Sequence, residues 1–190
     1  KGINVIVKES ERLTTLVEEL LDFSRMESGK LSLKNGILDI NKELLDVLEV
    51  FRERSKRDNI ELITELPANP IKMSGDANRL KQAFVNIIDN SFKYNKKGGF
   101  VKVSLENINN SVKIIISDNG CGISKNDLPR IREKFYKANN SVRGSGIGLA
   151  VTDEIIKLHN GEMIIESKIG KGTTITIILP KNSKKRWEYE

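Results

Sequence analysis

Four polar side chains near the middle of the chain are the residues best suited to ligand binding or catalysis: Asn86, Asn90, Lys93 and Tyr94. A helix turns by about 100° per residue, so this spacing places all four on one stripe. Carboxamide oxygens are ligands for Mg²⁺, and an ammonium group binds phosphate. Asn is a poor helix former because its side chain competes for backbone hydrogen bonds. The two asparagines, aligned with a lysine on one stripe, therefore indicate a nucleotide site, and a solvated helix face is the alternative.

The first of two glycine-rich segments is Asp118-Asn-Gly-Cys-Gly-Ile123, which begins where a predicted strand ends. Its glycines allow a sharp turn and the close approach of a flat ligand. The carboxylate of Asp118 can accept a hydrogen bond from an exocyclic amine, such as that of adenine. A hairpin turn is the alternative, because Asp-Asn-Gly is a common turn sequence.

The second glycine-rich segment, Gly144-Ser-Gly-Ile-Gly148, opens a predicted helix. Free backbone amides and the positive end of the helix dipole meet at such a junction. The segment is neither a P-loop nor a dinucleotide fingerprint, because no Gly-Lys-Ser/Thr follows it and no strand leads into it. It ends an irregular stretch that starts at Asn119 and is longer than the about 12 to 15 residues of an ordinary loop. This favours a lid over phosphates, with a flexible linker as the alternative.

Helices and strands alternate around these segments. Apolar residues recur at helical spacing from Asp76 to Tyr94, and further helices are predicted over 41–57, capped by Asp39, and over 146–159. The predicted strands span 31–34, 60–66, 71–73, 101–106, 112–117, 163–167 and 173–179. We therefore expect an α+β fold, a two-layer sandwich in which a mixed, mostly antiparallel sheet packs against three helices.

One long helix is predicted before this domain, over residues 1 to 28, with a nearly heptad apolar seam and a stop at Ser28-Gly29. A helix hairpin or a dimer would cover the seam, and packing on the domain itself is the alternative. We therefore divide the chain into a helix over 1–29, a domain over 30–180 and a charged tail over 181–190.

Composition excludes several classes of protein. The chain has 190 residues, of which 38% are hydrophobic, and no run has the eighteen apolar residues of a membrane span. The single cysteine, Cys121, excludes an internal disulfide, and a cytoplasmic location is expected. The 32 basic residues are interleaved with 26 acidic ones, so the net charge of +6 does not favour a nucleic-acid partner.

With these segments in order, residues 30–180 resemble the ATP-binding catalytic domain of bacterial sensor histidine kinases. That domain has the Bergerat ATP-binding fold, shared with type II topoisomerases, the MutL repair proteins and the ninety-kilodalton heat-shock chaperones. The matching motifs are an asparagine box (Asn86 to Tyr94), a first glycine box (Asp118 to Gly122), a phenylalanine box (Phe135 to Lys137), a second glycine box (Gly144 to Leu149) and Gly172-Thr173.

The resemblance implies a site for ATP and Mg²⁺. Asn90 would be the metal ligand, Asn86 would lie near the metal and phosphates, and Asp118 would bind the adenine amino group. The implied catalytic residues are Asn86, Lys93 and Lys137. The implied nucleotide-binding residues are Asn86, Asn90, Lys93, Tyr94, Asp118, Gly120, Gly122, Ile123, Lys137, Gly144, Ser145, Gly146, Ile147, Gly148, Leu149 and Thr173.

Some residues depart from the family pattern. The family usually has Ala where Ser91 stands, Phe where Ile131 stands and Arg where Lys137 stands. Relatives that hydrolyse ATP carry Glu at position 86 as a base, and the Asn86 carboxamide cannot accept a proton in this way. We therefore expect the domain to bind Mg-ATP without a base of its own.

In the family, the phosphoacceptor histidine lies on the first helix of a dimerising hairpin and is followed by an acidic residue. Residues 1–29 resemble the second helix of that hairpin. The single histidine, His159, has no acidic successor and is expected at a helix C-terminus, where its charge suits the dipole. The acceptor is therefore expected outside this chain.

The resemblance thus implies a kinase of two-component signalling that transfers phosphate from ATP to a histidine of the dimerisation domain, for relay to a cognate response regulator. The implied parent is a homodimer, with membrane anchoring left open. Two alternatives remain: an ATP-hydrolysing conformational switch of the same fold, or a catalytically idle module that binds nucleotide or nucleic acid.

Overall fold

The computed structural model describes residues 32–138 and 145–182, together with scattered residues between 7 and 28. Most of the helix predicted for residues 1–28, Gly144 and most of the predicted tail lie outside the described residues. The residues described between Val7 and Arg25 are helical, and Ser28 lies in a turn. No described helix is long and apolar enough to cross a membrane.

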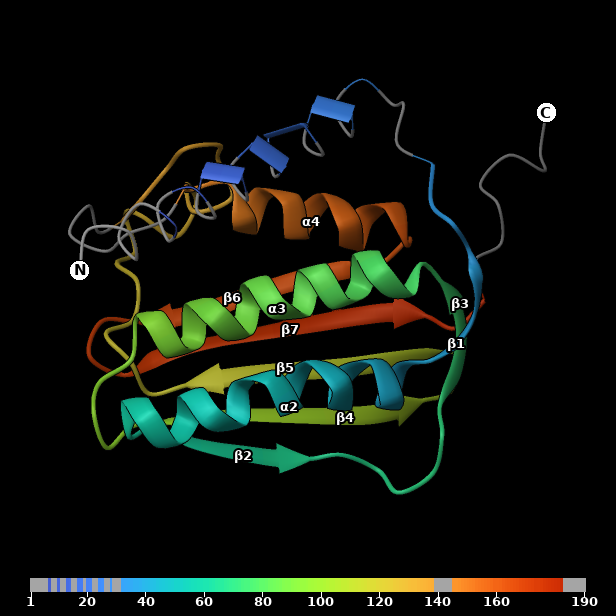
Figure 1. Ribbon diagram of the computed structural model, residues 1–190, viewed down its shortest axis with the longest axis horizontal. Helices are drawn as coiled ribbons and strands as arrows, with labels where there is room; N and C mark the ends of the chain where they lie inside the picture. Colours follow the sequence, from blue (N-terminus) through green and yellow to red (C-terminus); the bar gives the residue numbers. More distant parts are fainter. Residues whose placement is uncertain are drawn as a thin grey trace.

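A five-stranded sheet forms one layer of the domain (Figure 1). Its strands lie in the order β2-β4-β5-β7-β6. The β2–β4 pair is parallel, and the other three pairs are antiparallel. The strands are β2 (Glu61–Glu65), β4 (Phe100–Ile108), β5 (Ser111–Asp118), β6 (Glu162–Lys168) and β7 (Gly172–Pro180).

Three helices cover one face of this sheet: α2 (Ile40–Asp58), α3 (Ala77–Lys93) and α4 (Gly148–Leu158) (Figure 1). Alternate residues of β4 and β5 are buried, as expected of strands covered on one face only. These side chains and the apolar stripes of the helices form one core, which includes Phe84, Ile88, Ile116, Ile155 and Ile177. The predicted α+β sandwich is confirmed.

A separate antiparallel pair, β1 (Gly36–Asp39) and β3 (Lys72–Gly75), leads into two of the helices. Asp39 caps α2 by accepting a hydrogen bond from the N–H of Asn41, and Asp76 caps α3 by accepting one from Arg79. Asp76 directly follows β3, so the end of this strand sets where α3, the helix that carries the two asparagines, begins.

The strand predicted at residues 31–34 is wrong, because the strand lies at 36–39. Residues 32–35 have no regular structure, and the N–H of Lys34 donates to the Asp76 carboxylate over 2.9 Å. Pairing with β3 places Leu38 opposite Met73, and both side chains are buried. The buried pair sets the position of this strand, and the local alternation at 31–34 does not.

His159 follows α4, as predicted, but its expected positive charge is wrong. The ring is only 3% exposed. Its Nε2 accepts a hydrogen bond of 2.9 Å from the N–H of Asp76, and its Nδ1 lies 2.7 Å from the carbonyl oxygen of Ile155. Burial lowers the pKa of His159. A neutral ring that donates from Nδ1 and accepts at Nε2 satisfies both contacts.

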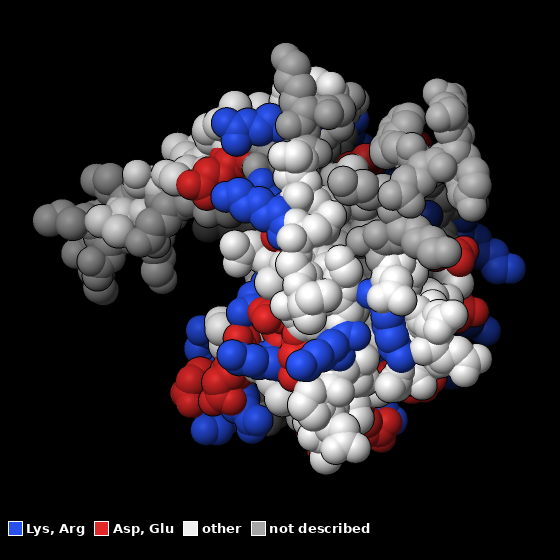
Figure 2. All heavy atoms as spheres, turned by 90° about the vertical axis from the view of Figure 1, so that its right-hand side faces the viewer, with Lys and Arg blue, Asp and Glu red and all other residues white. Residues whose placement is uncertain are grey.

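Charged side chains of both signs are mixed on the face shown in Figure 2. Ion pairs occur along the strands, such as Lys102 with Glu65 at 2.7 Å and Lys113 with Glu106 at 3.3 Å. On the face shown, the pattern is that of a solvated surface in which basic and acidic residues alternate.

Candidate functional site

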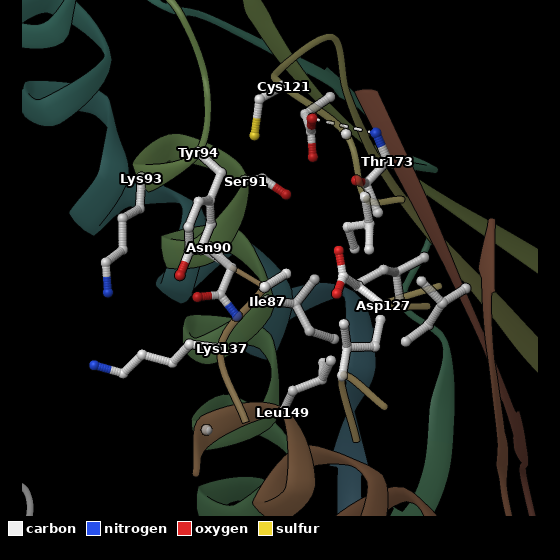
Figure 3. A pocket seen from close by; sticks show the side chains of 18 of the residues that line it. Ile87, Asn90, Ser91, Lys93, Tyr94, Cys121, Asp127, Lys137, Leu149 and Thr173 are labelled. Atoms are coloured by element: carbon white, nitrogen blue, oxygen red, sulfur yellow. Dashed lines mark hydrogen bonds between the residues drawn. The ribbon is translucent and has the colours of Figure 1, made fainter. Parts of the chain in front are cut away.

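A cavity of about 670 Å³ lies between α3, the start of α4 and the segments that follow β5. Figure 3 shows its lining from close by. The cavity brings together the asparagine stripe, both glycine segments and the Phe135–Lys137 motif, which are far apart in the sequence. The predicted residues that line it are Asn86, Asn90, Lys93, Tyr94, Asp118, Gly122, Ile123, Lys137, Ser145, Gly146, Gly148, Leu149 and Thr173.

The structure places the other predicted residues differently. Gly120 is buried and is not among the residues that line the cavity, and Ile147 is 3% exposed and belongs to the hydrophobic core. Gly144 lies outside the described residues.

Asp118 supplies a carboxylate at one end of the cavity. Its Oδ1 accepts hydrogen bonds from the N–H of Gly120 at 2.9 Å and of Thr173 at 3.3 Å (Figure 3, dashed line to Thr173). Burial raises the pKa of Asp118, while these two bonds and one from the hydroxyl of Ser91 lower it. The result is a partly buried acceptor, suited to a ligand that offers an N–H group.

Glycine is required in the turn after β5 because other backbone passes too close for a side chain. A Cβ atom on Gly122, whose φ is +69°, would lie 2.1 Å from the carbonyl oxygen of Lys168. A Cβ on Gly120 would lie 2.4 Å from the carbonyl oxygen of Tyr94. The first glycine segment is thus held between the end of α3 and the β6–β7 turn, which fixes the position of Asp118.

Asn86 connects the middle of α3 with the start of α4. Its Nδ2 donates to the carbonyl oxygen of Gly148 over 3.2 Å and to the Thr152 hydroxyl over 3.5 Å. A Cβ on Gly148 would lie 3.6 Å from the Asn86 carboxamide, so the two elements are in close contact. A carboxamide used in this way is a donor that positions α4.

The other end of the cavity carries positive charge. In Figure 3 the ammonium groups of Lys93 and Lys137 lie on the same side of the cavity as the carboxamide of Asn90. Among the described residues no side chain caps the adjoining helix α4, and the N-terminus of a helix favours an anion. Basic groups, a helix N-terminus and a neutral oxygen ligand form a suitable environment for phosphates and a divalent cation.

The segment after the first glycine box lines the cavity and is held by several side-chain contacts. The Tyr136 hydroxyl donates to Asp127, the Ser124 hydroxyl donates to the same carboxylate over 2.6 Å, and both bonds lower the pKa of Asp127. The guanidinium of Arg130 lies 4.2 Å from the centre of the Tyr136 ring. Arg132 anchors the segment to β6 by donating to the Met163 carbonyl over 2.6 Å.

The phenylalanine box lies against the second glycine box. Phe135 has a φ of +60° and its N–H donates to the carbonyl oxygen of Gly146 over 3.0 Å. A Cβ on Gly146, whose φ is +73°, would lie 2.8 Å from the Phe135 carbonyl carbon. The two motifs are therefore joined backbone to backbone.

Sequence reasoning missed part of the lining. Ser91 was noted only as a departure from the family pattern, and the charged or hydroxyl side chains of Asp127 and Ser124 were not singled out. Ile131 was likewise noted only as a departure, and the rest of the apolar wall was missed; it consists of Ile87, Ile165, Ile169 and Ile175. Ile165 and Ile175 are direct partners in the β6–β7 ladder, so alternation along these strands was the signal that could have revealed them.

Comparison with known proteins gives a match for residues 75–183, which fit the family described as histidine kinase-, DNA gyrase B-, and HSP90-like ATPase. The histidine protein kinase DivJ of Caulobacter vibrioides is 31% identical over 179 residues, which are 93% of this chain and 30% of DivJ. The chain thus spans about a third of the length of such curated relatives.

Solved structures agree in fold. The Acinetobacter baumannii histidine kinase AdeS is 26% identical, with a TM-score of 0.78 over 94% of this chain and 83% of AdeS. Full-length ShkA, solved in complex with AMPPNP, is 23% identical, with a TM-score of 0.83 over 94% of this chain and 38% of ShkA. The motif order, the cavity and the match to residues 75–183 agree, and the chain belongs to the histidine kinase-, DNA gyrase B- and HSP90-like ATPase family.

Proposed function

We propose that this chain is the catalytic part of a sensor histidine kinase, which binds Mg-ATP and transfers the γ-phosphate to a histidine of the dimerisation domain of its parent kinase. The observation that carries the proposal is the polarity of the cavity. Asp118 offers an acceptor at one end, while Lys93, Lys137 and the N-terminus of α4 meet at the other. An adenine nucleotide has a matching polarity, with an amine on its base and charge on its phosphates.

Each side chain has a proposed role in this reaction. Asp118 binds the adenine amine, Tyr94 lines the nucleotide, and Lys93 and Lys137 neutralise phosphate charge. Asn90 supplies one oxygen ligand to Mg²⁺, and phosphate oxygens and water would complete the coordination that this ion prefers. Phosphoryl transfer needs positioning and charge neutralisation more than covalent chemistry, so these residues suffice on the ATP side.

Asn86 supports transfer to a separate acceptor over hydrolysis. Its carboxamide donates to Gly148 and Thr152, and a carboxamide cannot take a proton from water. The acceptor histidine and any base are therefore placed on the dimerisation domain. His159 does not serve, because its ring is buried and both of its nitrogens are engaged.

The rest of the proposal concerns the whole protein. We infer that residues 1–29 are the second helix of the dimerisation hairpin, residues 30–180 the catalytic domain and residues 181–190 a tail. The parent would be a homodimer whose catalytic domain works in the cytoplasm, where ATP is available, and its phosphohistidine would supply a cognate response regulator.

The test is phosphorylation in trans. This chain is incubated with [γ-³²P]ATP and Mg²⁺, alone and with the full-length parent kinase in which Asn90→Ala has removed its own metal ligand. We expect acid-labile label on the parent and none on this chain. Stable histidine phosphate on this chain, or no label on the parent, would contradict the proposal. Steady release of phosphate without transfer would indicate the hydrolytic switch, and DNA binding without nucleotide binding would indicate the idle module.

A further inference from the structure

Arg54 links two neighbouring helices beside the cavity. It lies on α2, where its Nε donates to the Asp58 carboxylate over 3.1 Å, and its Nη1 donates to the carboxylate of Asp89 on α3. The helices α2 and α3 lie side by side and run in the same direction (Figure 1). The Arg54 side chain is only 23% exposed, whereas most arginines are exposed, so it is part of the contact between the two helices.

Two aromatic rings, one from each helix, hold the guanidinium of Arg54 in place. Its central carbon lies 5.9 Å from the centre of the Phe51 ring and 5.5 Å from that of the Phe92 ring. The rings are themselves stacked, with their centres 5.5 Å apart and 16° between their planes. A guanidinium is attracted to the face of an aromatic ring. The rings and the two carboxylates together give Arg54 a defined orientation, which an isolated surface ion pair lacks.

Asp89 brings a negative charge into the lining of the cavity. It directly precedes Asn90 and lies one helical turn before Lys93. Residues four apart on a helix are neighbours, so the Asp89 carboxylate is within reach of the Lys93 ammonium. In the proposed site this is the phosphate end, where a carboxylate without a cation would repel phosphate and compete with it for Lys93. Arg54 is not among the lining residues, and it neutralises Asp89 from outside the cavity.

We propose that Arg54 is a positioning residue for the phosphates of the nucleotide: it holds the Asp89 carboxylate toward α2 and neutralises it, which preserves the affinity of the cavity for a triphosphate. This inference rests on the proposed nucleotide site. Salt screens charges over about 8 Å at physiological ionic strength, so a charge in the lining acts on phosphates bound beside it. Loss of Arg54 alone leaves the Asp89 charge unopposed, and loss of both charges restores the balance.

The variants separate charge from packing. Arg54→Met keeps a long unbranched side chain over the two aromatic rings and removes the charge. Asp89→Asn keeps the shape of the side chain and removes its charge, and the double variant carries both changes. A defect in packing at Arg54 is not repaired by a change at Asp89, whereas a defect in charge is. Arg52→Met is the matched control, because Arg52 lies on the same helix, is 59% exposed and pairs with Glu49.

The experiment measures the dissociation constants of ATP and of adenosine with Mg²⁺ at pH 7.5 for the wild type and these four variants. We expect Arg54→Met to bind ATP between about twofold and fivefold more weakly, as for a partly exposed charge pair, and to bind adenosine unchanged because adenosine has no phosphate. The double variant should bind ATP as the wild type does, and so should Arg52→Met. The loss in Arg54→Met should disappear at about 1 M salt, where charges are screened within about 3 Å.

The remaining outcomes contradict the inference in distinct ways. Weaker ATP binding that persists in the double variant, or an equal loss for adenosine, would show that Arg54 acts through packing alone. An ATP affinity that is unchanged in Arg54→Met would overturn the role of Arg54 and leave the proposed function intact. If the wild type binds no nucleotide, the proposed function fails, and this inference fails with it.

A second readout does not depend on nucleotide. Urea unfolding of the wild type, Arg54→Met, Asp89→Asn and the double variant forms a double-mutant cycle. The two substitutions should affect stability non-additively, because each removes the same contact between α2 and α3. Additive effects would contradict the contact itself, whatever the affinity for ATP.

Discussion

The ring of His159 accepts a hydrogen bond of 2.9 Å from the backbone N–H of Asp76. This single bond joins the end of α4 to the residue that caps α3. The Asp76 carboxylate also receives the N–H of Lys34, so the segment that enters the domain meets the same junction. Both helices that border the cavity are therefore tied together at the end away from Asp118.

The first prediction concerns pH and stability. Burial lowers the pKa of His159 below its unfolded value of about 6.5. The neutral ring therefore contributes stability that is fully present above about pH 6.5 and is lost as the pH falls toward the folded pKa. One such group changes the free energy of unfolding by at most about 1.4 kcal/mol per pH unit.

Replacing His159 with Gln, which keeps an acceptor but does not titrate, should remove this slope. The measurement is urea unfolding of both proteins between pH 5 and pH 7.5. A stability difference between wild type and His159→Gln that stays constant across this window would contradict the buried neutral ring.

The second prediction separates binding from stability at Asp118. Its pKa is raised, so the stability it contributes is fully present below its unfolded pKa and is lost as the pH rises through the folded pKa. At neutral pH the buried charge is a cost that Asp118→Asn avoids. The variant should unfold at the same temperature or higher without nucleotide.

The same variant should bind ATP at least about tenfold more weakly. The N–H groups of Gly120 and Thr173 fix an oxygen at the Oδ1 position, so the amide group of the new side chain would face the adenine amine, donor against donor. Calorimetric titration measures the affinity and thermal unfolding measures the stability. Weaker binding with a large loss of stability would show that Asp118 is structural.

The third prediction compares two glycines with nearly the same backbone conformation. Gly122 and Gly170 have φ values of +69° and +72°, but a Cβ would meet backbone 2.1 Å away at Gly122 and nothing within 4 Å at Gly170. Gly170→Ala should cost about 1 kcal/mol of stability, for the left-handed conformation alone. Gly122→Ala should cost about 3 kcal/mol or more. Equal losses in chemical unfolding would refute the close packing of the first glycine segment.

Much of the fold follows from local pattern. The apolar periodicity of α3 and the alternation along β4 and β5 depend on neighbours in sequence, and these elements were predicted nearly to their ends. The position of β1 was missed because it is set by pairing with β3, about 35 residues further along. The neutral state of His159 was missed for the same reason, since its burial depends on Gly75 and Asp76, whose strand and cap lie far away in sequence.

The residues of the candidate site also divide into those that a local sequence motif predicts and those that only the tertiary structure brings together. Glycines and polar residues in recognisable motifs, such as Asn90 and Asp118, were predicted and are brought to one cavity. Asp127 and the wall residue Ile169 carry no motif and reach the cavity only through the path of the chain after β5 and after β6. Their contribution is a property of the tertiary structure.

The most direct test of the central claim, that this cavity binds Mg-ATP with Asn90 at the metal, is calorimetric titration of the chain with ATP in the presence and absence of Mg²⁺. We predict one site, with tighter binding when Mg²⁺ is present, and a loss of that Mg²⁺ dependence in Asn90→Ala because the carboxamide is an oxygen ligand. No binding of ATP under either condition, or the same Mg²⁺ dependence in wild type and Asn90→Ala, would contradict it.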